Sequence, residues 1–213
     1  MTGAGLAVGL SLIASIWFQL AYCWRSPSLG KSVVKTVSVG GLAIAAIWLN
    51  APVLLIAALL LGALGDFCLS RDGDPAFLTG LTAFAFSHLA YVALFVSIGA
   101  GLTFGLLSIY IGVFAIGMGA VLFQHAGALR WPVAAYVCII GAMGLLAADL
   151  PLALALAGFA ALLFIISDTV LGLEMFVLSS DGRLKRYAPF VVWPTYWLAQ
   201  FLFLLSFAGP VFA

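Results

Sequence analysis

Long apolar stretches follow one another along almost the whole chain, with only short polar connections between them. A helix needs roughly 20 mostly apolar residues to cross about 30 Å of hydrocarbon, so the chain has room for about eight such helices. Hydrophobic residues make up 66% of the 213 residues and charged residues 7%, which excludes a soluble domain that needs a polar surface. We therefore expect an all-α, polytopic transmembrane helical bundle that forms one integral membrane domain, residues 1–213.

Charged residues and clusters of proline or glycine mark the breaks between the apolar stretches. Between these breaks the sequence predicts eight transmembrane helices, over residues 3–23, 33–49, 53–70, 76–98, 102–123, 131–148, 151–178 and 189–209. The first stretch lacks the basic leader of a secretory signal peptide and is long enough to span the bilayer, so we expect a retained first helix.

The lysine and arginine residues all fall on one side of this predicted topology. They lie in, or next to, the connections after the first, third, fifth and seventh helices: Arg25, Lys31, Lys35, Arg71, Arg130, Arg183, Lys185 and Arg186. Positively charged connections are retained in the cytoplasm. The odd-numbered connections are therefore predicted to be cytoplasmic, and both termini non-cytoplasmic.

Two carboxyl groups are predicted to lie within the bilayer, in its cytoplasmic half. Asp66 lies about four residues, or about 6 Å, from the cytoplasmic end of its helix, and Asp168 lies about ten residues, or about 15 Å, from the end of its own. An ionisable residue deep in a spanning helix is costly, and is therefore a functional candidate by default. Other polar side chains of the predicted helices are candidates for supporting roles: Lys35, His88, Tyr91, Ser167, Tyr196 and Gln200.

A pair of neighbouring carboxyl groups can perform acid–base catalysis. One member protonates the substrate, while the other, ionised, stabilises positive charge or draws a proton from water. Ethers are cleaved in this way through an oxocarbenium ion. From the residues alone, three alternatives stay open: structural bonds between helices, a proton-coupled carrier, and an intramembrane aspartyl protease. The carrier is disfavoured by the absence of a visible repeat, and the protease because residue 63 is alanine where a Gly-x-Gly-Asp motif has glycine.

Neither a metal nor another cofactor is expected. Cys23, Cys68 and Cys138 form no Cys-x-x-Cys pair and have no histidine at metal-ligand spacing. No Gly-x-Ser-x-Gly nucleophile motif is present either. The near balance of eight basic and seven acidic residues gives no reason to expect a nucleic-acid partner.

Three blocks of sequence resemble the YhhN family, the lysoplasmalogenase family of integral membrane hydrolases. Residues 61–91, LGALGDFCLSRDGDPAFLTGLTAFAFSHLAY, are similar to its Gly-Asp, Phe-x-x-Gly and Ser/Ala-His-x-x-Tyr pattern. Residues 164–176, FIISDTVLGLEMF, and 195–202, TYWLAQFL, are similar to its Phe-x-x-Ser-Asp and Tyr-x-x-Ala-Gln blocks. One departure is Thr36, which stands where family members commonly have proline after the lysine.

The resemblance implies hydrolysis of the vinyl ether bond of a lysoplasmalogen, a single-chain lysophospholipid that enters from the bilayer. Asp66 and Asp168 would then be the proton donor and the stabilising carboxylate, in an order that the sequence leaves open. Tyr196, Gln200, Ser167 and His88 would orient the carboxyl pair, the water or the headgroup. The compact, Ala- and Leu-rich chain favours a bacterial inner membrane, with the site in the cytoplasmic half.

Overall fold

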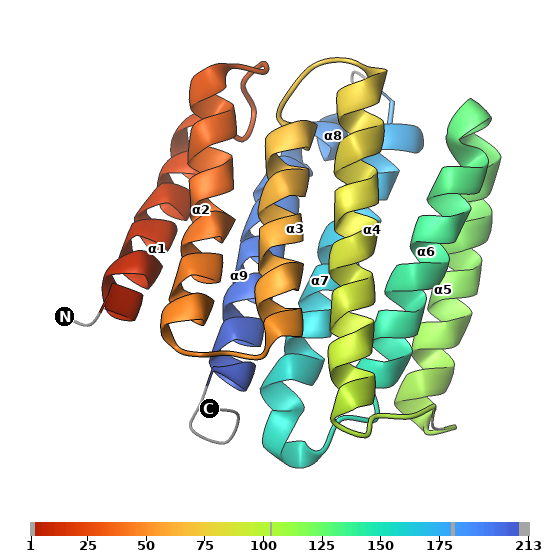
Figure 1. Ribbon diagram of the computed structural model, residues 1–213. Helices are drawn as coiled ribbons and strands as arrows, with labels where there is room; N and C mark the ends of the chain where they lie inside the picture. Colours follow the sequence, from red (N-terminus) through yellow and green to blue (C-terminus); the bar gives the residue numbers. More distant parts are fainter. Residues whose placement is uncertain (1–2, 103, 180–181, 209–213) are drawn as a thin grey trace. The chain divides into compact units, whose positions relative to one another are not determined.

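The computed structural model describes residues 3–102, 104–179 and 182–208 and contains helices but no strand in these ranges (Figure 1). Eight long helices are present: α1 Gly3–Ala21, α2 Leu29–Trp48, α3 Val53–Leu69, α4 Asp74–Ser97, α5 Leu106–His125, α6 Arg130–Ala147, α7 Ala155–Phe176 and α9 Pro189–Phe207. A short helix, α8 Arg183–Tyr187, and two 3-10 turns, Gly127–Leu129 and Leu152–Leu154, complete the described elements. The prediction of an all-helical protein with eight long helices is confirmed.

Most of these helices have the length and composition of transmembrane spans. Seven helical segments in the described part of the chain are long and apolar enough to cross a bilayer, each with at least 18 residues. The eighth, α3, is equally apolar but has 17 residues, which is the lower end of the length that spans hydrocarbon. The chain is therefore an integral membrane protein.

Several predicted helix boundaries were wrong by up to four residues. The segment predicted as 33–49 is helical from Leu29, because the Ser28 side chain accepts a hydrogen bond from the backbone N–H of Lys31 and caps the helix. The segments predicted as 102–123 and 151–178 begin their α-helices only at Leu106 and Ala155. Of the stretches predicted as 102–123 and 189–209, Thr103 and Gly209 lie outside the described residues. The short helix α8 was not predicted.

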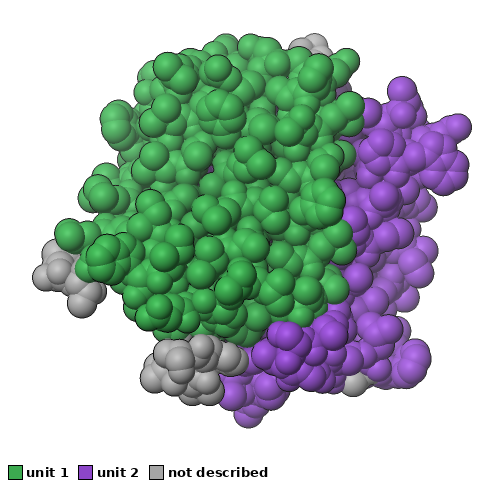
Figure 2. All heavy atoms as spheres, in the orientation of Figure 1, with its two compact units in different colours: residues 1–94, 200–213 green, residues 95–199 purple. Residues whose placement is uncertain are grey.

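The chain divides into two compact units, which Figure 2 shows in separate colours. Unit 1 comprises residues 1–94 and 200–213, and unit 2 comprises residues 95–199. The boundaries fall inside α4 and α9, so α9 contributes to unit 2 up to Ala199 and to unit 1 from Gln200 onward. A single membrane domain over residues 1–213 stays a prediction.

Small residues allow the helices of unit 1 to pack closely. The Ser11 hydroxyl of α1 donates a hydrogen bond to the Ser38 carbonyl oxygen of α2, and a Cβ atom on Gly41 would lie 3.0 Å from the Ala7 carbonyl oxygen. Figure 1 shows α2 next to α1 and α3, and the start of α1 at the same end of unit 1 as the end of α9. An even number of spans requires this arrangement of the ends, but which side of the membrane they face stays a prediction.

In unit 2, glycines of α6 bring this helix close to α5 and α7. A Cβ atom on Gly141 would lie 3.3 Å from the Ala115 side chain of α5. One on Gly144 would lie 2.6 Å from the Ile165 side chain of α7. Figure 1 shows these three helices as neighbours. Close approach through glycine is how helices associate where lipid removes the hydrophobic driving force.

Candidate active site

Asp66 lies on the buried face of α3. The buried residues of this helix recur at helical spacing and form one stripe: Leu55, Ala58, Leu59, Gly62, Ala63, Gly65 and Asp66. Asp66 is 1% exposed and ends this stripe, one turn before the C-terminal end of the helix. Gly62 lies one turn before Asp66 on the same face. The sequence therefore places a carboxyl group at the end of an otherwise apolar buried surface.

Lys35 of α2 compensates the charge of Asp66. Its Nζ atom lies 3.2 Å from Oδ1 of Asp66, and its side chain is only 17% exposed. The ammonium group also lies 5.9 Å from the centre of the Phe18 ring of α1, so three helices surround it. Burying a charge is tolerated when it is paired. The pair explains how neighbouring apolar helices can each carry an ionisable residue.

The buried face of α4 carries the polar side chains of the first sequence block. His88 is fully buried, and its Nδ1 atom lies 2.7 Å from the Phe84 carbonyl oxygen one turn earlier. Because a carbonyl oxygen only accepts, Nδ1 carries the hydrogen, and in the neutral ring Nε2 is the acceptor. The Ser87 hydroxyl donates to the Ala58 carbonyl oxygen of α3 at 2.8 Å and so fixes α4 against α3.

Tyr91 connects α4 to the part of α9 that belongs to unit 1. Its hydroxyl donates a hydrogen bond to Oε1 of Gln200 at 2.5 Å, and its ring stacks on Phe203 with the ring centres 4.1 Å apart. Both Tyr91 and Gln200 are fully buried. The Gln200 Nε2 atom has no hydrogen-bond acceptor among the described residues. The structure therefore brings together two of the predicted supporting residues and leaves one buried amide donor available.

Asp168, the second predicted carboxyl group, lies in unit 2 and is partly buried in α7. The Tyr136 hydroxyl of α6 donates a hydrogen bond to Oδ2 of Asp168. Sequence reasoning missed Tyr136. Its signal was weak because a tyrosine two turns into a helix that starts at Arg130 and Trp131 is easily taken for part of the interfacial aromatic belt.

Two further predicted site residues of unit 2 make structural contacts. The Ser167 hydroxyl donates to the Val192 carbonyl oxygen of α9 at 3.0 Å, so it connects α7 to α9. The Tyr196 ring is buried, edge-on against Phe164 with the ring centres 5.3 Å apart, and tilted against Trp193 at 5.7 Å. These contacts hold α7, the helix of Asp168, against the unit 2 part of α9.

The predicted residues thus divide between the units. Unit 1 gathers Lys35 with Asp66, and Tyr91 with Gln200, while unit 2 holds Asp168, Ser167 and Tyr196. The pairing of Asp66 with Asp168 stays a prediction. Within the ranges that the structure describes, no group of three or more His, Cys, Asp or Glu side chains is arranged to hold a metal ion.

Long apolar helices with buried carboxylates, each held by a partner on a neighbouring helix, define a class of polytopic membrane proteins with ionisable groups inside the bilayer. Comparison with known families shows which family within this class the chain belongs to. The model of the YhhN family matches residues 30–207, which include all the predicted site residues, so the chain belongs to the YhhN family.

The chain is also similar to one named protein. It is 33% identical over 161 residues to the Bos taurus protein lysoplasmalogenase TMEM86A. The match covers 71% of this chain and 64% of the bovine protein, so the chain spans less than two thirds of the length of that relative. No solved structure matches the chain.

Proposed function

We propose that this protein hydrolyses the vinyl ether bond of lysoplasmalogens and releases a fatty aldehyde and a glycerophospho-ethanolamine or glycerophospho-choline. The observation that carries the proposal is that each unit holds one aspartate inside the membrane with a donor on a neighbouring helix, Lys35 for Asp66 and Tyr136 for Asp168. Membership of the YhhN family and the similarity to a lysoplasmalogenase support the choice of substrate.

The reaction needs one acid and one base. A carboxylic acid delivers its proton to the β-carbon of the vinyl ether, which makes an oxocarbenium ion. Water adds to the carbon next to the ether oxygen and loses a proton to the carboxylate. The resulting hemiacetal then collapses to the aldehyde and the glycerol hydroxyl, so that one water is consumed in total. Proton transfer by positioned carboxyl groups typically accelerates such steps by roughly 10²–10⁴-fold.

The partners of the two aspartates suggest how the roles are divided. Asp66 is paired with an ammonium group, which favours the ionised carboxylate and suits a base that takes the proton of water. The partner that donates to Oδ2 of Asp168 is an uncharged hydroxyl, which favours the ionised carboxylate less than the ammonium group of Lys35 does and so suits the acid better. We therefore assign the acid to Asp168 and the base to Asp66.

The supporting residues of unit 1 suit an oxygen-rich substrate. The Gln200 amide is held at Oε1 by Tyr91, and its Nε2 atom can donate to the ether or glycerol oxygen. The Nε2 atom of His88 can accept a hydrogen bond from the attacking water. Ser167 and Tyr196 are assigned to the support of α7 and α9 instead, because of their contacts with Val192 and Phe164.

The basic residues suggest the orientation of the lipid. Asp66 is close to the end of α3 that precedes Arg71, and Asp168 lies in the half of α7 that leads towards Arg183. A phosphate headgroup at that basic end would place the vinyl ether a short way into the bilayer. We propose that this end is cytoplasmic, with both termini on the other side.

The test is release of aldehyde by the purified protein in detergent. In deuterated water, one deuterium should appear on the carbon next to the aldehyde carbonyl, after a control for exchange of the free aldehyde. A carrier would release no aldehyde. A lysophospholipid with an ester in place of the vinyl ether should remain intact and at most compete. Efficient release of fatty acid from that ester would contradict protonation of carbon as the mechanism.

A further inference from the structure

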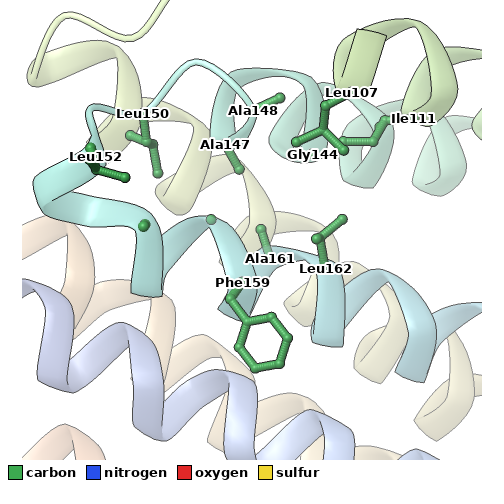
Figure 3. Close-up of a pocket in the computed structure, with 12 residues that line it drawn as sticks. Leu107, Ile111, Gly144, Ala147, Ala148, Leu150, Leu152, Phe159, Ala161 and Leu162 are labelled. Carbon is green, nitrogen blue, oxygen red and sulfur yellow. The ribbon is translucent and has the colours of Figure 1, made fainter.

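Unit 2 contains a cavity of about 430 Å³ between α5, α6 and α7 (Figure 3). Its lining consists of apolar side chains and glycine: Leu107, Ile111, Gly144, Ala147, Ala148, Leu150, Leu152, Ala155, Gly158, Phe159, Ala161 and Leu162. Figure 3 shows these residues on two facing walls, one from α5 and α6 and the other from α7 and the segment before it. Six of the twelve lining residues are glycine or alanine, whose small side chains leave more space than larger ones would.

The cavity reaches from the outer surface of unit 2 into its core. Among its lining residues Leu107, Leu152 and Phe159 are exposed, with Leu152 91% exposed. Ile111 and Ala161 are buried at its inner side. Leu107 of α5 and Phe159 of α7 belong to segments long and apolar enough to span a membrane, so their exposed side chains meet hydrocarbon. A chain in the bilayer can therefore enter sideways without crossing water.

The chemistry of the lining selects the occupant. A buried water needs two to four polar partners, and the lining offers them only through backbone atoms because all of its side chains are apolar. Ligand pockets typically have volumes of about 300–1,000 Å³ and are mostly apolar. If a methylene group takes about the 30 Å³ of a water molecule, the cavity has room for on the order of ten. The occupant that matches is one flexible hydrocarbon chain.

The position of the cavity along the helix of Asp168 indicates which hydrocarbon chain it could hold. Along α7, Leu162 precedes Asp168 by six residues, or about 9 Å, and along α6, Gly144 follows Tyr136 by eight residues, or about 12 Å. The same two helices therefore carry the Tyr136–Asp168 pair and, further along, the walls of the cavity. A chain whose reactive end is near Asp168 would extend along them into the cavity.

We propose that this cavity binds the hydrocarbon chain of the single-chain lysophospholipid substrate. The proposal rests on the proposed function for the identity of the reactive end. Because lipid tails are as apolar as the lining, the cavity gains little from hydrophobic transfer and selects by shape and length. It therefore sets the chain length that the protein accepts, while the headgroup and the vinyl ether are bound elsewhere.

The test uses photolabelling, which does not depend on hydrolysis. The probe is a lysophospholipid with a non-cleavable alkyl ether and a diazirine near the end of its chain, added to the full-length protein in detergent micelles. Labels should concentrate on residues 107–111 and 144–162. Unlabelled lysophospholipid should compete, and diacyl phospholipid should not. Labels spread evenly over all lipid-facing helices, or equal competition by the diacyl lipid, would overturn the proposal.

A matched pair of variants sharpens the test. Gly158→Leu adds a side chain towards the cavity, and its Cβ atom would make only an ordinary contact of 3.4 Å with the Ala147 carbonyl oxygen. Gly117→Leu, in α5, is the control, because a Cβ atom there meets nothing within 4 Å and Gly117 does not line the cavity. Overpacking costs at least about 1 kcal/mol, so labelling by the long-chain probe should fall at least about fivefold in Gly158→Leu and stay unchanged in the control.

Aldehyde release separates failure of this proposal from failure of the proposed function. Gly158→Leu should shift the accepted vinyl ether chain towards shorter lengths, with turnover of short-chain substrate retained. Specific labelling of the cavity without any aldehyde release would support the lipid site and contradict the hydrolase. Aldehyde release with labels elsewhere, or with an unchanged chain-length profile in Gly158→Leu, would overturn the cavity proposal alone.

Discussion

The two aspartates differ in burial and in the partner that stabilises the carboxyl group inside the membrane. In unit 1, Asp66 is almost completely buried and its charge is neutralised by Lys35 of the neighbouring helix. In unit 2, Asp168 is less buried and accepts a hydrogen bond from the neutral Tyr136. Unit 1 therefore contains a compensated ion pair among polar neighbours, whereas in unit 2 the carboxyl group of Asp168 has a hydroxyl partner and stands on a helix that also lines an apolar cavity.

This difference matters for the proposed mechanism because the surroundings of a carboxyl group determine whether it is protonated or ionised. A nearby cation favours the ionised carboxylate more strongly than an uncharged hydroxyl donor does, while an apolar environment favours the acid form. Two carboxyl groups in unlike environments are the usual arrangement for one base and one acid. The proposed division of roles thus gives separate, measurable expectations for two residues that the sequence alone presents as equivalent.

Removal of either carboxylate should have the largest effect. Asp66→Asn and Asp168→Asn keep the size of the side chain but remove the base or the acid, so aldehyde release should fall roughly 10²–10⁴-fold in each. Because the two would act in one reaction, the double variant should be hardly slower than the slower single one. Near-normal turnover in a correctly folded single variant would remove that residue from proton transfer and contradict the proposed division of roles between the two aspartates.

The ion pair predicts that unit 1 depends on the Lys35 ammonium group for stability. Lys35→Met leaves the Asp66 carboxylate buried without its counter-charge, which typically costs about 3–5 kcal/mol. Thermal unfolding in detergent should occur at a clearly lower temperature, and a second substitution, Asp66→Asn, should restore much of the loss. Lys31→Met, on the same helix, is the control: its Nζ atom donates to the Arg25 carbonyl oxygen, so this variant loses a hydrogen bond to a neutral group and should change less. If the double variant is no more stable than Lys35→Met, the two side chains are not coupled.

The comparison also shows what the sequence could and could not predict. The helices and the burial of Asp66 follow from long apolar stretches interrupted by single polar residues, which local patterns reveal. The residues that pair with the two aspartates were harder to predict. Tyr136 is separated from Asp168 by 32 positions, and only the packing of α6 on α7 brings them together. The cavity was not predictable either, because it depends on which small residues face each other across three helices.

The contact between α3 and α4 predicts a smaller effect, again confined to unit 1. A Cβ atom on Gly65 would lie 2.6 Å from the Phe84 ring, and the Phe84 carbonyl oxygen holds His88. Gly65→Ala should therefore displace Phe84 and destabilise the protein by about 1–3 kcal/mol, the usual range for overpacking. Gly9→Ala, where a Cβ atom meets nothing within 4 Å, is the matched control. Equal unfolding temperatures for the two variants would mean that α3 and α4 are not tightly packed here.

Tyr136→Phe should have the smallest effect and tests the neutral partner of Asp168 directly. The substitution keeps the ring and removes only the hydroxyl that donates to Oδ2, and a typical hydrogen bond contributes about 0.5–1.5 kcal/mol. If Tyr136 positions the acid, this loss appears in the reaction rather than in substrate binding, so kcat should fall up to about tenfold, the factor for about 1.4 kcal/mol, while KM changes little. Tyr110→Phe, an exposed tyrosine of α5, controls for the general loss of a hydroxyl. A purely structural Tyr136 would instead lower the unfolding temperature and leave the kcat of the folded fraction unchanged, and the contrast between a charged partner for Asp66 and a neutral one for Asp168 would then have no consequence for catalysis.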